Sequence, residues 1–317
     1  MSIWTRLRRA RREQRTVFVL SGGAVRGAAQ VGMLREVLAA GIYPDAVVAV
    51  SAGAFNGLPI ANDPTLAQVD LLEEIWRGVA ENPPVRSGAL RAWLSIVRGL
   101  PGFDTGERLR DMVEEHAPVA DLGDTLLPIH VGTTAASTGR LCWWSEGPAV
   151  DILCASAAIP GVFPAVPLID GDLHLDGGVL SNLPLRHAVT LSPTHLVVFD
   201  VAADFLPPEK QTAITSMMTG FRAATLELTR QEWLDVPPDV EVLHIELPEP
   251  SGGLDLDFGE TEELFAKGSG AARGAMERQN RFTDCGPPPA ASPRERVPRP
   301  PSGRSARIRA ARGGHRG

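Results

Sequence analysis

Short apolar runs alternate with segments of helical periodicity along most of the chain. Apolar, β-branched runs bounded by glycine, proline or polar residues predict strands at 16–20, 45–50, 128–137, 140–146, 172–178, 194–203 and 240–249. Apolar residues spaced three or four apart predict helices at 26–41, 54–62, 64–80, 87–98, 105–117, 150–158, 211–235 and 258–280. Strands that are apolar throughout and alternate with helices are typical of parallel sheets. The pattern therefore predicts a three-layer α/β/α fold with a central, mostly parallel sheet.

Composition supports a single large domain. The chain has 317 residues, of which 44% are hydrophobic and 22% charged, as in ordinary globular proteins. No internal repeat or interdomain linker interrupts the alternation of strands and helices. We therefore expect a basic N-terminal arm at 1–15, one α/β domain at 16–283, and a Pro/Arg-rich tail at 284–317.

Cysteine usage and hydropathy bear on location. Cys142, Cys154 and Cys285 have no metal-like spacing and form no even set for disulfides, which favours a reducing compartment. No apolar run approaches the roughly 18 residues of a membrane-spanning helix. The apolar stretch behind the basic N-terminus, "VFVL", is too short for a signal peptide. The expected location is the cytoplasm, with peripheral contact at the inner membrane surface left open.

The net charge of −7 hides an asymmetry between the ends and the body of the chain. Residues 1–15 contain six Arg and one acid, and residues 286–317 contain eight Arg and one acid, which leaves a body near −19. The tail has almost nothing to bury and is predicted to be disordered. Basic ends suit contact with an anionic membrane surface, but solvated tails have the same composition. No nucleic-acid partner is expected, and the sequence does not indicate an oligomeric state.

The first predicted strand runs into a glycine-rich turn, "SGGAVRGAAQ" (21–30). A Walker A loop would need lysine where Ala28 stands, and a dinucleotide fingerprint would need glycine in place of Ala24. What remains is a run of small residues whose backbone N–H groups face an anion at a helix N-terminus. Such a turn can bind a phosphate, stabilise the oxyanion of acyl transfer, or hold no ligand.

The second predicted strand runs into "AVSAGAFNG" (49–57), which has the form of a nucleophile elbow. An elbow needs small residues two before and two after the nucleophile, because strand and helix pass close to each other there. Gly53 meets the second requirement, and Ala49 adds one methyl at the first. The alternative is that Ser51 only caps the following helix.

A serine nucleophile needs a general base. Chain order allows His187, His195 or His244 to complete a triad, although none lies in a glycine-flanked loop. Asp176 lies at a predicted strand end before two glycines, and this position suits either a base or a turn-forming residue. Alternation also places Asp172, His174 and Asp176 on one strand face, but no further metal ligands occur at recognisable spacing.

Four blocks in this order resemble the patatin-like phospholipases: "GGAVRG" (22–27), "AVSAG" (49–53), "ASAAIPGVFPAV" (155–166) and "DGGVLSNLP" (176–184). The resemblance covers about residues 16–280. It implies a serine esterase that hydrolyses lipid acyl esters through a Ser51–Asp176 dyad, without a catalytic histidine, metal or organic cofactor. It further implies an oxyanion hole formed by Gly22, Gly23, Ala24, Arg26 and Gly27, with elbow and supporting roles for Ala49, Gly53, Gly177 and Gly178.

The departure from the family pattern is Ala49, where the family usually has glycine. It leaves open a weak or inactive member that binds lipid or regulates a partner. A nucleotide-binding module using "GGAVRG" is a third class, against which the missing lysine and glycine argue. The amphipathic segment 83–103 suits an interfacial lid or a helix packed on the core, because apolar and basic residues alternate along it: Trp93, Leu94, Ile96 and Val97 beside Arg86, Arg91 and Arg98.

Overall fold

The computed structural model describes residues 14–85, 102, 104–202, 213–247 and 258–279, all within one compact unit that spans Met1–Pro287. The predicted helix at 87–98, nearly all of the amphipathic segment, most of the N-terminal arm and the whole C-terminal tail lie outside these residues. The domain boundaries therefore stay predictions. Within the described part of the chain, no helix is long and apolar enough to cross a membrane.

The core of the protein is an eight-stranded sheet in the order β5-β6-β3-β2-β1-β7-β8, with β4 paired to β3. Five strands run parallel: β1 (Thr16–Leu20), β2 (Ala46–Ala49), β3 (Ile129–Ala135), β7 (His195–Asp200) and β8 (Glu241–Glu246). The antiparallel strands are β4 (Arg140–Trp144), β5 (Val166–Pro167) and β6 (Leu173–Asp176). The mostly parallel sheet is confirmed, and among the strands of the described residues β5 is the one that the pattern does not predict.

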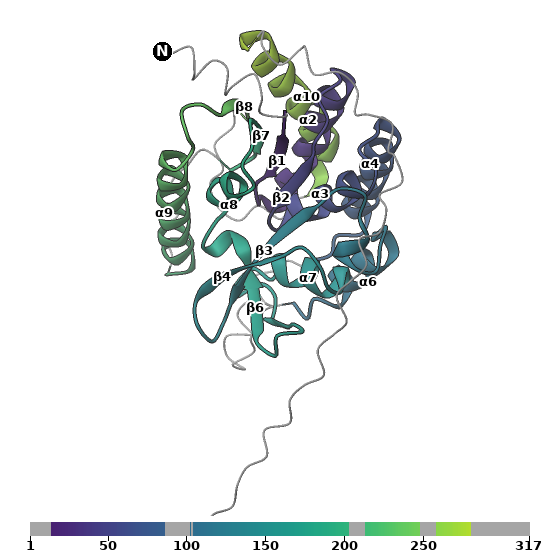
Figure 1. Cartoon of the computed structure of the whole chain (residues 1–317). Coiled ribbons are helices and arrows are strands. Elements are labelled where there is room, and N and C mark those ends of the chain that lie inside the picture. The colour runs from purple at the N-terminus through teal and green to yellow at the C-terminus, as the bar shows by residue number, and fades with distance from the viewer. Residues whose placement is uncertain (1–13, 86–101, 103, 203–212, 248–257, 280–317) are drawn as a thin grey trace, which may run out of the picture. The chain divides into compact units, whose positions relative to one another are not determined.

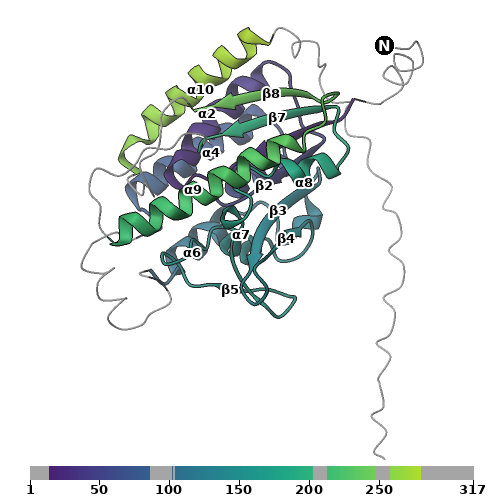
Figure 2. The same cartoon turned by 90° about the vertical axis from the view of Figure 1, so that its left-hand side faces the viewer.

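Helices cover both faces of the sheet, as Figures 1 and 2 show. In β1, Phe18 and Leu20 join the larger core cluster, whereas Val17 and Val19 join the smaller one, because successive side chains point to opposite faces. The larger cluster includes α2 (Gly27–Ala39), α3 (Ala52–Asn62), α4 (Leu66–Glu81), α6 (Glu107–His116), α7 (Ala149–Ser156) and α10 (Thr261–Arg278). The smaller one includes α8 (Leu185–Thr190) and the end of α9 (Ala213–Leu234). The three-layer prediction is confirmed.

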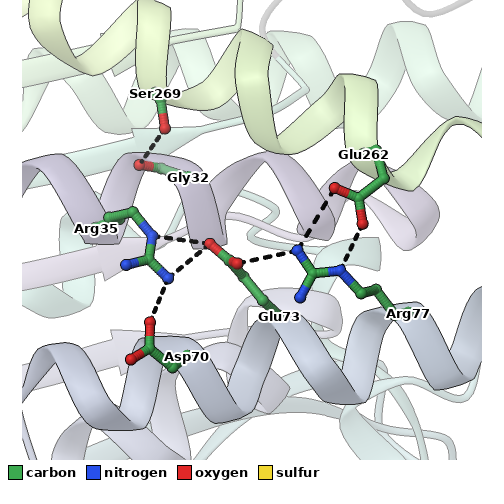
Figure 3. A network of polar contacts seen from close by, with 7 residues as sticks. All are labelled: Gly32, Arg35, Asp70, Glu73, Arg77, Glu262 and Ser269. Carbon is green, nitrogen blue, oxygen red and sulfur yellow. Dashed lines mark hydrogen bonds and ion pairs between the residues drawn. The ribbon is translucent and has the colours of Figure 1, made fainter.

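On the outer side, α2 packs against α10 with their backbones in contact. A Cβ atom at Gly268 would lie 1.9 Å from the carbonyl oxygen of Ala29, and one at Gly32 would lie 2.1 Å from that of Phe265. The Ser269 hydroxyl donates to the Gly32 carbonyl oxygen at 3.2 Å, as Figure 3 shows. The two glycines therefore set how close these helices come.

Ion pairs connect α4 to both neighbours across this surface (Figure 3). Arg35 of α2 donates to Glu73 of α4 at 2.8 Å, and Arg77 of α4 donates to Glu262 of α10 at 2.5 Å. These side chains are partly exposed, so each pair adds little to stability and mainly fixes the register of the helices.

Two antiparallel strands, β4 and β6, pair with β3 in addition to the parallel strand β2. Val131 pairs with both β4 and β2, whereas Thr133 pairs with both β4 and β6. Since a residue has one partner on each side, β2 and β6 follow one another along the same edge of β3. The carboxyl ends of β2 and β6 therefore meet head to head, with Gly132 of β3 between them.

A buried polar network joins the helices behind the first two strands. The Gln30 amide of α2 donates to the Ser21 carbonyl oxygen at 2.8 Å. The Asn56 amide of α3 donates to Gly27 O at 2.8 Å and to Gln30 Oε1 at 2.9 Å, and its own oxygen accepts from Trp76 Nε1 at 2.9 Å. Gln30 and Asn56 are fully buried, so the network fixes α2, α3 and α4 relative to the end of β1.

The start of α3 packs against the strands by close contact. A Cβ atom at Gly53 would lie 2.6 Å from the carbonyl oxygens of both Leu20 and Ser21, so only glycine fits there. Ala49 is fully buried, and its methyl faces α3 at Gly57, where an added Cβ would lie 3.3 Å away. The absence of a side chain at Gly57 therefore leaves room for the Ala49 methyl and also for Val47 Cγ1, which would lie 3.0 Å from the added Cβ.

We expect Asn56→Leu to lower the free energy of unfolding by about 2–4 kcal/mol, because it leaves Gln30 Oε1 and Trp76 Nε1 buried without their partner. Urea unfolding measures the effect. Asn82→Leu, on the exposed end of α4, is the matched control and should change stability by less than about 0.5 kcal/mol. Equal effects of the two substitutions would contradict the role of the network.

We expect a favourable coupling between Ala49→Gly and Gly57→Ala, because an alanine at 57 would meet the Ala49 methyl at 3.3 Å in the wild-type background. In a double-mutant cycle, the double variant should be more stable than the sum of the singles by about 0.5–1 kcal/mol. Unfolding midpoints of the four proteins measure it, and strict additivity would show that the two positions do not share this space.

Candidate active site

Ser51 occupies the sharp turn between β2 and α3. Its φ and ψ angles are 53° and −130°, a left-handed conformation that costs a non-glycine residue about 1–3 kcal/mol. Ser51 stands at the N-cap position of α3, but its side chain makes no capping hydrogen bond. The interpretation of Ser51 as a side-chain cap is therefore wrong, and the strained turn directs its hydroxyl elsewhere.

Ser156 at the end of α7 holds this turn in place. Its hydroxyl oxygen accepts from the Ser51 backbone N–H at 2.8 Å, and its proton goes to the Gly132 carbonyl oxygen at 2.8 Å. Ser156 is fully buried. It lies in the gap beside Gly132 of β3, between Val131, which pairs with the end of β2, and Thr133, which pairs with the end of β6. It thus satisfies two backbone groups that the sheet leaves without partners.

Asp176 is the last residue of β6 and reaches the same gap. Its backbone is fixed on both sides, because its N–H donates to Ala158 O at 3.0 Å and its carbonyl oxygen accepts from Thr134 Oγ1 at 2.9 Å. The carboxylate accepts from the Gly178 N–H at 2.7 Å. A Cβ atom at Gly177 would lie 2.3 Å from Gly132 O, so the turn after Asp176 needs glycine there.

Burial raises the pKa of Asp176 to about 7, and hydrogen bonds with Gly178 and with the Ser51 side chain oppose the rise. The Asp176 carboxyl group and the Ser51 side chain are therefore hydrogen-bond partners. A carboxylate with a pKa near neutrality is a stronger base than an ordinary aspartate and is still ionised in part at pH 7.

The turn between β1 and α2 faces Ser51 from the other side. A Cβ atom at Gly22 would lie 3.2 Å from Ser51 Cβ. The Gly22 N–H donates to Asn182 O at 3.0 Å, and Asn182 Nδ2 returns a bond to Gly22 O at 3.2 Å. Within the described part of the chain, the N–H groups of Gly23 and Ala24 donate to no other group. The donors that this turn offers to a ligand are therefore those of Gly23 and Ala24, and Gly22 instead anchors the turn.

The residues around these donors fix the shape of the turn. Ala24 has a φ of 50°, the same uncommon region that Ser51 occupies. A Cβ atom at Gly23 would lie 2.5 Å from Val201 Cγ2, and one at Gly27 would lie 2.8 Å from Ala52 Cβ in the elbow. Arg26, between them, is buried with its side chain beside the site. The two turns are therefore packed directly against each other.

Two pockets meet at Ser51. One is largely apolar and lies between α3, α4 and α6, with walls that include Phe55, Leu72, Trp76, Val79, Phe163 and Phe258. The other, here called the polar pocket, is the more polar of the two and contains Asp176, Gly23, Arg26 and Asn182, with residues of α9 as its far wall. Ser51 and Ala24 line both pockets. A molecule with an apolar and a polar part can therefore place the bond between them at Ser51.

The histidines offered by chain order lie elsewhere. His187 stacks on Trp143 with ring centroids 4.1 Å apart and contacts His130 at 3.1 Å, and burial lowers its pKa to about 4. His195 lies beside Glu241 at the start of β7, and His244 contacts Asp200. The described residues that line the polar pocket include no histidine, so a triad through any of these three is not formed.

His174 and Asp172, which are predicted to share a strand face with Asp176, have other partners. His174 is fully buried between Thr133 Oγ1, at 2.9 Å, and the Asp170 carboxylate, at 3.0 Å. Asp172 accepts from the Ser137 hydroxyl. Among the described residues, no group of three or more His, Cys, Asp or Glu side chains is placed to hold a metal ion.

Sequence reasoning missed two residues that shape the site. Ser156 and Asn182 both lie within the quoted blocks, but each acts on a backbone group far away in the chain. Their polar character inside apolar segments was the available signal. Which backbone group they bind depends on the packing of α7 and of the turn after β6.

Part of this chain is similar in sequence to proteins of an animal and of a fungus. Patatin-like phospholipase domain-containing protein 7 of Rattus norvegicus is 27% identical over 205 residues, which are 64% of this chain and 15% of that protein. Lysophospholipase nte1 of Aspergillus terreus is 29% identical over 187 residues, 58% of this chain and 12% of that protein. The chain thus matches only about a seventh or less of the length of these relatives.

Among solved structures, VipD from Legionella pneumophila aligns with 84% of this chain and 67% of that chain, at 13% identity and a TM-score of 0.47. The family model for patatin-like phospholipase matches residues 18–189, which is more than half of the chain and includes both turns and Asp176. The chain belongs to the patatin-like phospholipase family.

Proposed function

We propose that this protein is a carboxylic ester hydrolase that cleaves acyl esters of lipids, with Ser51 as the nucleophile and Asp176 as the general base. The observation that carries the proposal is the position of Ser51, which lies beside a buried carboxyl group and at the junction of an apolar and a polar pocket. The named lysophospholipase and phospholipase relatives support a lipid substrate.

The first half-reaction acylates Ser51. Asp176 takes the hydroxyl proton as Ser51 Oγ bonds to the acyl carbonyl carbon, and the oxyanion that forms accepts hydrogen bonds from the Gly23 and Ala24 N–H groups. The carbon–oxygen bond to the alcohol then breaks, and Asp176 gives the proton to the departing oxygen. The products are acyl-Ser51 and the free alcohol.

The second half-reaction releases the acid. Asp176 accepts a proton from a water molecule as its oxygen attacks the acyl carbon, and the same N–H groups stabilise the second oxyanion. Ser51 Oγ leaves and recovers the proton from Asp176, so the enzyme returns to its starting state. An aspartate is a weak base for an alcohol, and therefore the raised pKa of Asp176 and the preorganised donors both lower the barrier.

The apolar pocket suits the acyl chain. Its aromatic and aliphatic walls begin at Ser51 and extend between α3, α4 and α6. Burying a hydrocarbon chain there gains about 0.8 kcal/mol for each methylene, so chain length should contribute to affinity. The alcohol part then lies on the polar side, where it can leave toward solvent.

We expect Ser51→Ala to abolish hydrolysis of a p-nitrophenyl acyl ester and labelling by a fluorophosphonate probe, and Asp176→Asn to lower kcat by about 10²–10⁴-fold, because each removes a reacting group. His187→Gln, His195→Gln and His244→Gln are the controls and should keep activity within about threefold. Full activity of either dyad variant would refute the assignment. Failure of Ser51 to label would instead favour a non-catalytic lipid-binding member.

We expect kcat/KM to rise with pH through about 7, because the reactive form of Asp176 is the ionised one and its pKa is raised to about 7. A pH-rate profile from pH 5 to 9 measures the effect, about tenfold per pH unit on the acidic side. A flat profile over that range would contradict a base with a pKa near 7.

Stability should change with pH in the opposite direction. The folded-state pKa of Asp176 lies above its ordinary value of 3.8, so the folded state holds this proton more tightly, and the stability gained is lost as pH rises from about 4 through about 7. Asp176→Asn keeps an uncharged side chain there. The variant should therefore lose less unfolding free energy than the wild type between pH 5.5 and 8.5, measured by urea unfolding.

A further inference from the structure

A carboxyl group is buried in the last turn of α9. Glu232 is only 3% exposed, and it continues the face of the helix on which Phe221, Thr225 and Thr229 line the polar pocket. Figure 2 shows α9 running beside α8 along one face of the sheet. A glutamate is almost never buried to this extent unless partners compensate its charge. The partners of Glu232 therefore show what it holds in place.

Glu232 accepts hydrogen bonds from two segments that precede α9 in the chain. The backbone N–H of Arg186, in the first turn of α8, donates to Glu232 Oε2 at 2.9 Å. The side chain of Ser181, which is itself buried in the loop before α8, makes a second bond. Burial raises the pKa of Glu232, and these bonds oppose the rise. Glu232 thus joins the end of α9 to the loop 177–184 and to the start of α8.

The loop 177–184 makes two contacts on which the proposed chemistry depends. At one end, the Gly178 N–H donates to the Asp176 carboxylate at 2.7 Å. At the other, Asn182 accepts from the Gly22 N–H at 3.0 Å and donates to the Gly22 carbonyl oxygen at 3.2 Å. The loop therefore contacts the general base and the oxyanion turn at the same time.

Ser181 lies between these two contacts. Its N–H donates to Gly177 O at 3.0 Å, and Asn182 is the next residue in the chain. We propose that Glu232 is a positioning residue for the reaction: it holds the loop so that one end stabilises the general base and the other anchors the oxyanion turn. This inference rests on the proposed hydrolase function and adds to it a residue that acts from behind the site.

A surface ion pair provides the matched control. Arg186 Nε donates to Asp235 Oδ2 at 2.6 Å, and both side chains are exposed. This pair joins α8 to the end of α9, as Glu232 does, but it does not involve the loop. Asp235→Asn therefore loosens the contact between the two helices and leaves the bond to Ser181 intact.

The kinetic test uses a p-nitrophenyl acyl ester. Glu232→Ala should lower kcat by about tenfold to a hundredfold and leave KM within about threefold, because the reacting groups lose their alignment while the apolar pocket is retained. Glu232→Gln keeps one acceptor oxygen and should lose less. Ser181→Ala removes the same bond from the loop side, so combining it with Glu232→Ala should cause no further loss. Asp235→Asn should keep kcat within about twofold.

The pH profile distinguishes positioning from a direct effect of charge. The Gly178 bond lowers the pKa of Asp176, so a loosened loop should move the acidic limb of kcat/KM to higher pH by about half a unit to one unit in Glu232→Gln and Glu232→Ala. Loss of the Glu232 charge acting through space would move the limb to lower pH, because a nearby anion raises the pKa of a carboxyl group. A shift to lower pH would therefore overturn the inference.

Hydrogen exchange gives a readout that does not require hydrolysis. In Glu232→Ala, the backbone amides of segments 20–27 and 177–184 should exchange about tenfold faster than in the wild type, whereas Asp235→Asn should leave them unchanged. This result would support the positioning role even if the wild type cleaved no ester. Should Glu232→Ala fail to fold, Ser181→Ala carries the same expectations.

Two further outcomes would overturn the inference and leave the hydrolase proposal intact. Equal effects of Asp235→Asn and Glu232→Ala on kcat and exchange would mean that Glu232 acts only through the packing of α8 against α9. Unchanged exchange in both segments, together with kcat within about twofold of the wild type, would mean that the loop keeps its form without Glu232.

Discussion

The site depends on how closely two helix N-termini approach the ends of two parallel strands. Gly53 of α3 lies against the carbonyl oxygens of Leu20 and Ser21, and Gly27 of α2 lies against Ala52. Only glycine allows these contacts, so the chain must turn sharply after each strand, and Ala24 and Ser51 both take positive φ angles. The buried bonds of Gln30 and Asn56 hold the helices against the resulting strain. Backbone donors and a serine hydroxyl are thereby fixed on opposite sides of one small space.

The second constraint is electrostatic. Asp176 is almost completely buried, and burial favours its neutral form, which makes the folded state less stable as pH rises. The surrounding structure limits this cost with one backbone donor, Gly178, and one hydroxyl, Ser51. A more polar surrounding would stabilise the carboxylate and weaken it as a base. The same burial that costs stability therefore suits the group for proton transfer.

The sequence predicted most elements because their signals are local. Apolar runs such as that of β1 and the glycine turn after it are readable without tertiary contacts, and the two turns together with "DGG" marked Ser51 and Asp176 as candidates. Two-residue β5 carries too few positions to show alternation, and it exists only because it pairs with β6. Ala49 was the doubtful residue of the elbow. Its methyl fits because Gly57, in the second turn of α3, lies opposite, and the strand pattern does not reveal how that helix packs.

By itself, the sequence determined the order of strands and helices, the turns that require small residues, and the residue types able to do acyl chemistry. The tertiary structure alone decided which of them meet. Ser51 and Asp176 lie 125 positions apart in the numbering, and they face each other because β2 and β6 share one edge of β3. It also decided that Ser156 bridges that gap and that the Gly22 N–H donates to Asn182 O, which leaves it unavailable to a ligand. The physical reason is that strand register and helix packing are set by long-range pairing and burial, which no local pattern encodes.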